Sequence, residues 1–252
     1  MTIINSQLIK KIICIIPARF NSKRFPGKPL VKILGVPMLL RTYNQCLKVV
    51  NKDQIFIATD DNRIKNLCLK NDINFIITSK SCLTGTDRVV EVSRKLKYKN
   101  FINIQGDEPI FNPNDLKKII LATVKDPSFV YAGYCKIDNS NQYRDFSIPK
   151  LVFNKNNDLI YTSRASIPSN KKNKFHIGYR QVCLYSYPIK LLNKLNKKKS
   201  LLEKLEDLEL LRFLDSNIIV KMIKMSSKSI SVDSPKDIKK VIKRIKGVQK
   251  VL

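Results

Sequence analysis

Short apolar runs alternate with amphipathic segments through the first half of the chain, and this alternation sets the fold class. Residues 12–16 (Ile-Ile-Cys-Ile-Ile) form a continuous apolar run, which is typical of a strand buried on both faces of a parallel sheet. Strands that alternate with helices indicate βαβ units and a largely parallel sheet. Further strands are predicted at 55–58, 75–77 and 101–104, with helices at 37–50, 61–69, 87–96 and 114–124 between and after them.

The second half of the chain has a less regular pattern. It predicts a partly antiparallel region followed by a helix, another strand and a closing helix, with Ser234 as the N-cap of the last one. No internal repeat and no linker divides the chain, so we expect a single domain over residues 1–252. The expected strands span 129–137, 151–153, 159–161, 180–187 and 218–225, and the expected helices span 201–214 and 235–245.

The net charge of +28 raises the question of a polyanionic partner. The excess consists mainly of Lys and is dispersed along the chain, and no aromatic-flanked basic motif or helix-turn-helix signal accompanies it. Specific nucleic-acid binding is therefore not expected. A polyanion-binding protein remains the non-enzymatic alternative.

The sequence also allows predictions about the cellular location of the protein and the role of its cysteines. No apolar run approaches the ~18 residues of a membrane span, and residues 1–11 lack the apolar stretch of a signal peptide, so a cytoplasmic protein without membrane association is expected. The six Cys have no paired spacing and are expected to be small buried hydrophobes, not disulfide partners or zinc ligands.

A basic loop over residues 17–28 follows the first predicted strand. It holds Arg19, Lys23, Arg24 and Lys28, while Gly27 permits close backbone approach. Basic side chains and backbone amides neutralise the charge of a triphosphate, so the loop is a candidate phosphate-binding segment. An exposed basic loop with turn residues is the alternative explanation, and the loop alone does not separate the two.

The turn at 103–109 (Asn-Ile-Gln-Gly-Asp-Glu-Pro) follows a predicted central strand. Mg²⁺ is usually held by one or two carboxylates together with substrate phosphates, and Asp107 is a candidate for this role. Gln105 could hydrogen-bond a polar group of a ligand. Asp107 could instead only cap the next helix, but its place at a strand end favours the functional interpretation.

Two further segments have both a functional and a plain structural explanation. Residues 84–88 open a helix whose first amides could bind a base or a phosphate, or the segment is an ordinary helix start with Thr86 as N-cap. Asp233 precedes the closing helix and could be the second carboxylate on a metal, or only a capping residue. The polar segments 17–28, 59–61 and 105–109 follow strands one, two and four and are expected to meet at one cleft.

Taken together, these segments resemble the 3-deoxy-manno-octulosonate (Kdo) cytidylyltransferase family, the CMP-Kdo synthetases. The family opening I-I-P-A-R-x-x-S-x-R-x-P-G-K is similar to residues 15–28, and N-x-Q-G-D-E-P is similar to 103–109. The order of the motifs is kept over nearly the whole chain. The other matching segments are 28–38, 58–60, 85–88, 163–168, 202–212 and 232–235.

The resemblance implies a GT-A-like α/β nucleotidyltransferase fold, with a mostly parallel central sheet flanked by helices and a smaller irregular antiparallel region. It implies a nucleotide-binding half at about 1–125, a sugar-binding and dimerisation half at about 126–252, and a homodimer. It also implies Mg²⁺-dependent transfer of CMP from CTP to the anomeric hydroxyl of a 3-deoxy sugar acid for lipopolysaccharide biosynthesis. Pyrophosphate leaves, and no protein nucleophile is needed.

The site residues carried over by this resemblance fall into three groups, with Arg19, Lys28 and Asp107 expected to be catalytic. The expected nucleotide-binding residues are Pro17, Ala18, Arg19, Arg24, Lys28, Thr59, Asp60, Gly85, Thr86 and Arg88. The expected Mg²⁺ ligands are Asp107 and Asp233, and the expected sugar-side residues are Gln105, Arg164, Gln181, Tyr185, Glu206 and Glu209.

The chain departs from the family pattern in residues 180–187. Gln181 stands where the family has His, and Cys183 stands where it has Gly. This stretch lies on the sugar side, so the acceptor is expected to be Kdo, its 8-amino analogue or another ulosonic acid such as a sialic-acid-like sugar. A Gln at this position can still donate a hydrogen bond.

Overall fold

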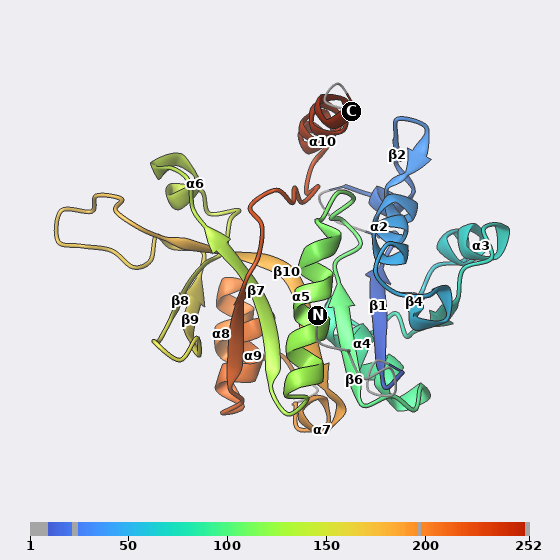
Figure 1. Cartoon of the computed structure of the whole chain (residues 1–252), viewed down its shortest axis with the longest axis horizontal. Coiled ribbons are helices and arrows are strands. Elements are labelled where there is room, and N and C mark those ends of the chain that lie inside the picture. The colour runs from blue at the N-terminus through green and yellow to red at the C-terminus, as the bar shows by residue number, and fades with distance from the viewer. Residues whose placement is uncertain (1–9, 22–24, 196–197, 250–252) are drawn as a thin grey trace.

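A mixed sheet of nine strands forms the centre of the computed structural model, which describes residues 10–21, 25–195 and 198–249 (Figure 1). Its first-half strands pair in parallel, as the sequence predicts. The strand order is β11 (Val220–Lys224), β7 (Val130–Lys136), β10 (Tyr179–Pro188), β6 (Asn100–Ile104), β1 (Ile12–Ala18), β4 (Ile55–Thr59) and β5 (Phe75–Ile77).

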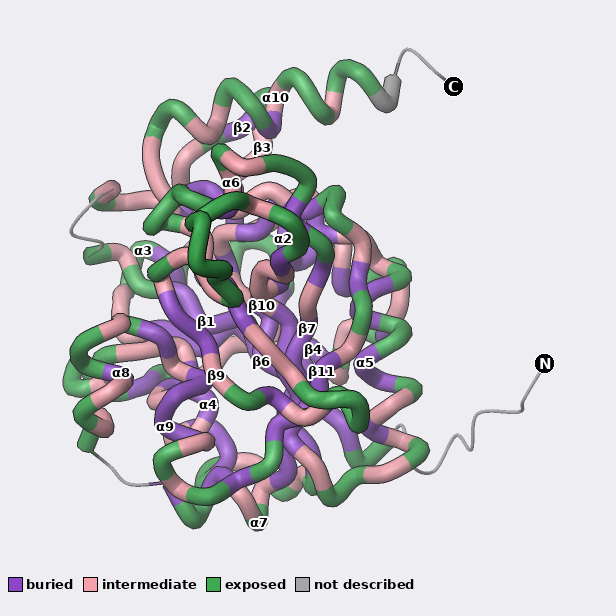
Figure 2. Tube along the Cα trace, turned by 90° about the vertical axis from the view of Figure 1, so that its left-hand side faces the viewer, coloured by how far each residue is buried: buried purple, intermediate pink, exposed green. Residues whose placement is uncertain are grey.

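Strand β1 is buried on both faces, which explains its unbroken apolar sequence. Ile12, Cys14 and Ile16 pack on one side of the sheet, while Ile13 and Ile15 pack on the other. Figure 2 shows the buried positions concentrated along the strands. The first side is covered by α2 (Met38–Leu47), α3 (Asn62–Lys70) and α5 (Pro113–Lys125), and the second by α4 (Gly85–Lys95), α7 (Ile189–Leu192) and α9 (Leu210–Asp215).

The predicted antiparallel region is built around the long strand β10. This strand runs antiparallel to both β6 and β7, and its register with β7 shifts between Val182 and Tyr185, so Cys183 lies in an irregular stretch. A hairpin of β8 (Lys150–Phe153) and β9 (Leu159–Ser163) pairs with the first residues of β10. The short helix α6 (Ser140–Arg144) lies between β7 and β8.

The helix predicted over 201–214 is wrong in one respect, because the structure divides it into two. Helix α8 (Leu201–Glu206) ends where Asp207 adopts a left-handed conformation with φ 52°, and α9 begins at Leu210. The apolar periodicity of the segment continues across this break, so periodicity alone did not reveal it. The turn lets Glu206 and Glu209 bind different parts of the chain: Glu206 binds Ser163 and Arg164, and Glu209 binds the first amides of α4.

The closing helix α10 (Pro235–Gln249) packs against a separate small layer. Val241 and Val232 are buried with Ile33 and Met38, beside the hairpin of β2 (Lys32–Ile33) and β3 (Val36–Pro37). In Figure 1, α10 lies away from the central sheet, at the top of the view and to the left of β2. This packing holds residues 232–235 over the basic loop. No helix within the described residues is long and apolar enough to cross a membrane.

Candidate functional site

Three segments that are distant in the sequence meet at the side chain of Lys28. Its Nζ lies 2.6 Å from Asp107 Oδ2, 2.9 Å from the Val232 carbonyl oxygen and 3.8 Å from Asp233 Oδ1. Lys28 opens the short 3-10 helix η1 (Lys28–Leu30), Asp107 follows β6, and Asp233 precedes α10. The structure thus brings together the basic loop, the acidic turn and the segment before the closing helix.

Close backbone contacts hold these segments in place. Gly106 packs so tightly that a Cβ atom there would lie 3.0 Å from the Pro17 carbonyl oxygen. The backbone N–H of Val232 donates to the Asp107 carbonyl oxygen at 2.9 Å. Gly27 adopts φ 72°, a left-handed conformation that glycine takes readily, and it turns the loop into η1. The Asp107 carboxylate is therefore positioned by its backbone as well as by Lys28.

The donor set around Lys28 fits a hard divalent cation. Two carboxylates from different parts of the chain converge on one positive charge, and oxygen ligands are those that Mg²⁺ prefers. Among the described residues, no group of three or more His, Cys, Asp or Glu side chains gathers as a metal site. A cation held by Asp107 and Asp233 would therefore complete its coordination with substrate phosphates and water, as Mg²⁺ commonly does.

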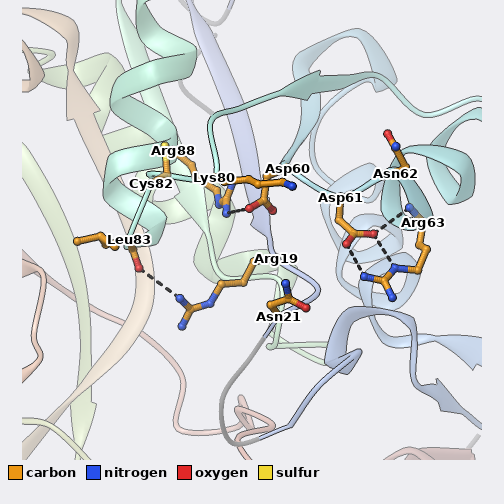
Figure 3. A pocket seen from close by; sticks show the side chains of 10 residues that line it. All are labelled: Arg19, Asn21, Asp60, Asp61, Asn62, Arg63, Lys80, Cys82, Leu83 and Arg88. Carbon is orange, nitrogen blue, oxygen red and sulfur yellow. Dashed lines mark hydrogen bonds and ion pairs between the residues drawn. The ribbon is translucent and has the colours of Figure 1, made fainter.

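A cavity of about 560 Å³ is lined by Arg19 and Asn21 of the basic loop and by residues from 60–63 and 80–88 (Figure 3). Arg19 points across it and donates from its guanidinium to the Leu83 carbonyl oxygen at 3.3 Å. Arg63 pairs with Asp61 at 2.7 Å, and its guanidinium also lies over the Phe20 ring. The lining residues are Arg19, Asn21, Asp60, Asp61, Asn62, Arg63, Lys80, Cys82, Leu83 and Arg88.

Several of the expected nucleotide-binding residues support the cavity wall. Arg88 is only 3% exposed, pairs with Asp60 at 3.0 Å and donates to Thr78 Oγ1 at 2.5 Å. Thr59 is fully buried, and its hydroxyl accepts from the Asp61 N–H. Pro17 and Ala18 end β1 and are buried. Lys23 and Arg24, predicted to bind the triphosphate, lie outside the described residues.

The start of α4 differs from the sequence-based alternatives. Thr84, not Thr86, is the N-cap, and it forms a capping box with Asp87. The N–H groups of Gly85 and Thr86 donate to the Glu209 carboxylate at 3.3 and 2.7 Å. The amides that could have bound a base or a phosphate are thus held by a side chain of this same chain. Burial raises the pKa of Glu209.

Glu206 holds the end of β9 in a similar way. Its carboxylate accepts from the Ser163 hydroxyl at 2.6 Å and from the Arg164 N–H at 2.9 Å. The Arg164 guanidinium donates to the backbone carbonyl oxygens of Phe146, Glu206 and Asp207 at 2.7–3.2 Å. These three bonds to neutral carbonyls orient the guanidinium, and the exposed Asp207 carboxylate also lies 4.0 Å from it.

Gln181 and Tyr185 lie together on β10. The Gln181 side-chain amide donates to the Tyr185 hydroxyl, and its Oε1 is buried with no hydrogen-bond partner within the described residues. Tyr185 stacks on Tyr187 and is 4% exposed, and burial raises the pKa of its hydroxyl. Gln105 extends toward the start of α4, where its Nε2 would lie 3.3 Å from a Cβ placed on Gly85.

Glu108 is a buried acid that sequence reasoning missed. It is 4% exposed, and Oε2 has no hydrogen-bond partner within the described part of the chain. Burial, together with the charge of Asp107, raises its pKa to about 7 from a usual value of 4.5. Glu108 lies in a polar turn, so the sequence did not indicate that its side chain is buried. The burial is visible only in the tertiary structure.

The Glu108→Gln variant should be more stable than the native chain at pH 8 but not at pH 4. The folded-state pKa is raised, so stability from the neutral carboxyl is complete below pH 4.5 and is lost as the pH rises toward 7. Glutamine stays neutral throughout and should raise the free energy of unfolding at pH 8 by about 2–3 kcal/mol. Urea denaturation at both pH values measures this difference, and equal stabilities at pH 8 would refute it.

Comparisons with known proteins identify the family of the chain. A family model described as cytidylyltransferase matches residues 13–229. The 3-deoxy-manno-octulosonate cytidylyltransferase of Protochlamydia amoebophila is 37% identical over 94% of this chain and 95% of its own length. The Escherichia coli protein of that name is 32% identical over 92% and 95%.

Solved structures support the same fold. A CMP:2-keto-3-deoxy-manno-octonic acid synthetase complexed with CTP superposes with a TM-score of 0.85 and 31% identity, over 95% of this chain and 99% of that one. The inositol-1-phosphate CTP transferase of T. maritima, at 15% identity, has a TM-score of 0.67 over 94% and 95%. At that identity, the second likeness concerns the fold alone.

Proposed function

Because the chain belongs to the 3-deoxy-manno-octulosonate cytidylyltransferase family, we propose that it transfers CMP from CTP to the anomeric hydroxyl of Kdo and releases pyrophosphate. The chain is a nucleotidyltransferase by this membership. The observation that carries the proposal is the meeting of Lys28, Asp107 and Asp233 at the carboxyl end of β6, together with a cavity lined by Arg19 of the same basic loop. Ligands of such sheets bind beyond the carboxyl ends of the strands.

On the nucleotide side, the chain supplies positive charge and fixed geometry. Arg19 and Lys28, with Arg24 of the same loop, would bind the phosphate oxygens of CTP. Asp107 and Asp233 would hold a divalent cation, which we take to be Mg²⁺ and which neutralises charge on the triphosphate when bound. In-line attack by the sugar hydroxyl on the α-phosphorus needs no protein nucleophile, so these residues act by positioning and electrostatics.

On the acceptor side, Arg164 is the group best suited to the carboxylate of a sugar acid. Its guanidinium is held in place by three neutral carbonyls and is 30% exposed. Its ion pair with Asp207 is long, at 4.0 Å, and Asp207 is 76% exposed, so the guanidinium can still bind an anion. The buried Oε1 of Gln181 can accept a hydrogen bond from a hydroxyl or an amine of the acceptor. Both Kdo and its 8-amino analogue offer such a donor.

A pyrophosphate-release screen tests the function directly. Four nucleoside triphosphates are each combined with Kdo, 8-amino-Kdo and a sialic acid, with and without Mg²⁺. We expect release only with CTP, a 3-deoxy sugar acid and a divalent cation, and CMP-sugar formation equal to the pyrophosphate released. Salt-sensitive binding of RNA or DNA without any CTP turnover would contradict the proposal and favour a polyanion-binding protein.

A further inference from the structure

Arg212 forms the centre of a buried ionic cluster between α8 and α4. It is 2% exposed, and its Nε and one terminal nitrogen each donate to a Glu203 carboxylate oxygen at 2.6 Å. The other terminal nitrogen donates to Asp87 Oδ1 at 2.6 Å. A planar guanidinium can serve three carboxylate oxygens in this fixed arrangement, whereas a Lys ammonium cannot reproduce it.

The Asp87 arm of the cluster fixes the start of α4. Asp87 uses its second oxygen to accept from the N–H groups of Leu83 and Thr84, so one carboxylate both caps the helix and binds Arg212. Glu209, less than one turn before Arg212 on the chain, holds the next two amides of the helix. A Cβ on Gly85 would lie 3.3 Å from Gln105 Nε2 and 3.6 Å from Pro17, so this helix start contacts the catalytic loops.

The ion pair with Glu203 connects Arg212 to helix α8. Glu203 is fully buried in α8, which ends at Glu206, the residue that binds Ser163 and Arg164. The turn from 206 to 209 therefore joins Glu206, which binds Ser163 and Arg164, to Glu209, which binds the first amides of α4. Arg212 joins the helices on both sides of that turn.

We propose that Arg212 is a positioning residue for CMP transfer, because it sets the 206–209 turn and thereby aligns Arg164 with the start of α4. This inference rests on the proposed function. A buried ion pair generally adds little stability over apolar residues of similar size, so its specific geometry is the feature to explain. A displacement of about 1 Å between reacting groups can lower a rate about 100-fold.

The Glu203→Leu/Arg212→Met double variant tests this role. It removes the Glu203–Arg212 ion pair without leaving either of these two charges buried and unpaired, and it keeps the core filled. Asp87 loses one partner but is 19% exposed and keeps its bonds from the Leu83 and Thr84 N–H groups. We expect a folded protein whose KM for CTP stays within about threefold, while kcat for pyrophosphate release falls at least about 20-fold. If Arg212 had only a structural role, this double variant, whose core is filled, would keep the kcat of the native chain. A double variant with kcat within threefold of the native value would overturn the proposal.

Two further variants make the test specific. The Asp158→Asn/Lys221→Met variant removes an ion pair of 2.5 Å between the β8–β9 turn and the edge strand β11, and it should keep kcat within about twofold. If the first double variant does not fold, Arg212→Lys replaces it, since it retains the charge but loses the fork geometry. The Arg212→Lys variant should lose at least about 10-fold in kcat, and a smaller loss overturns the proposal.

Amide hydrogen exchange separates this inference from the proposed function. If the native chain does not turn over CTP with any sugar acid, the proposed function fails, and exchange then judges the positioning role alone. Faster exchange of residues 83–88 and 163–165 in the Glu203→Leu/Arg212→Met variant, with β1 and β4 unchanged, supports it. Unchanged exchange in either segment overturns it.

Discussion

Replacing Asp107 with Asn is expected to lower CTP-dependent pyrophosphate release at least about 100-fold while the fold remains intact. The substitution keeps the size of the side chain but removes the charge that contacts Lys28 at 2.6 Å and that would hold a divalent cation. The backbone of Asp107 would still accept from Val232, so the turn should keep its position. Steady-state kinetics over a range of Mg²⁺ concentrations, with thermal denaturation alongside, measure both expectations.

A matched control is available in Asp53, an exposed aspartate of the 3-10 helix η2 (Lys52–Gln54) before β4. Asp53→Asn removes the same charge from a chain of net charge +28 but does not touch the Lys28 cluster, so it should leave turnover unchanged. Near-normal turnover by Asp107→Asn would remove this residue from the catalytic machinery. A loss of activity that parallels unfolding would instead indicate a structural role.

The sequence predicted the sheet and the meeting point of the loops because both follow from local rules. The apolar run of β1 could only be accommodated with cover on both faces, and the parallel strands then had to end at one edge. The prediction was that 17–28, 59–61 and 105–109 would meet at one cleft. Lys28 contacts Asp107, and Arg19 lines a cavity with Asp60 and Asp61, but no residue of 105–109 lines that cavity. The 79-residue separation of Lys28 and Asp107 did not matter, because the βαβ topology fixes where strand ends lie.

The parts that sequence reasoning missed depend on side chains that meet without a topological rule. Arg212 and Asp87 are 125 residues apart, and no sequence pattern in either segment predicts their contact. Likewise, the sequence left open whether the first amides of this helix bind a base or a phosphate or only begin an ordinary helix, and in the structure the Gly85 and Thr86 amides are bound to Glu209. The break at Asp207 was hidden because the apolar spacing of one helix runs through both α8 and α9. The roles assigned to Glu206 and Glu209 on the sugar side stay predictions.

Replacing Lys28 with Met should have two opposite effects, one on cation binding and one on turnover. In the nucleotide-free chain the Lys28 ammonium lies where the carboxylates of Asp107 and Asp233 converge, so it competes with any added cation. Without it, affinity for a divalent cation should rise about 5- to 10-fold, as expected for partly exposed charges. Turnover should fall at least about 100-fold, because the variant lacks the ammonium that would neutralise negative charge on the triphosphate.

Calorimetric titration with Mg²⁺ and Mn²⁺ in the absence of nucleotide measures the first effect, and pyrophosphate release measures the second. Lys32→Met is the matched control, since Lys32 is exposed on β2 and only four residues away. It removes the same charge and should change neither cation affinity nor rate. Tighter cation binding with lost turnover would mean that Lys28 lies between the cation site and the triphosphate site. Lost turnover without tighter binding would mean that Asp107 and Asp233 do not share a cation.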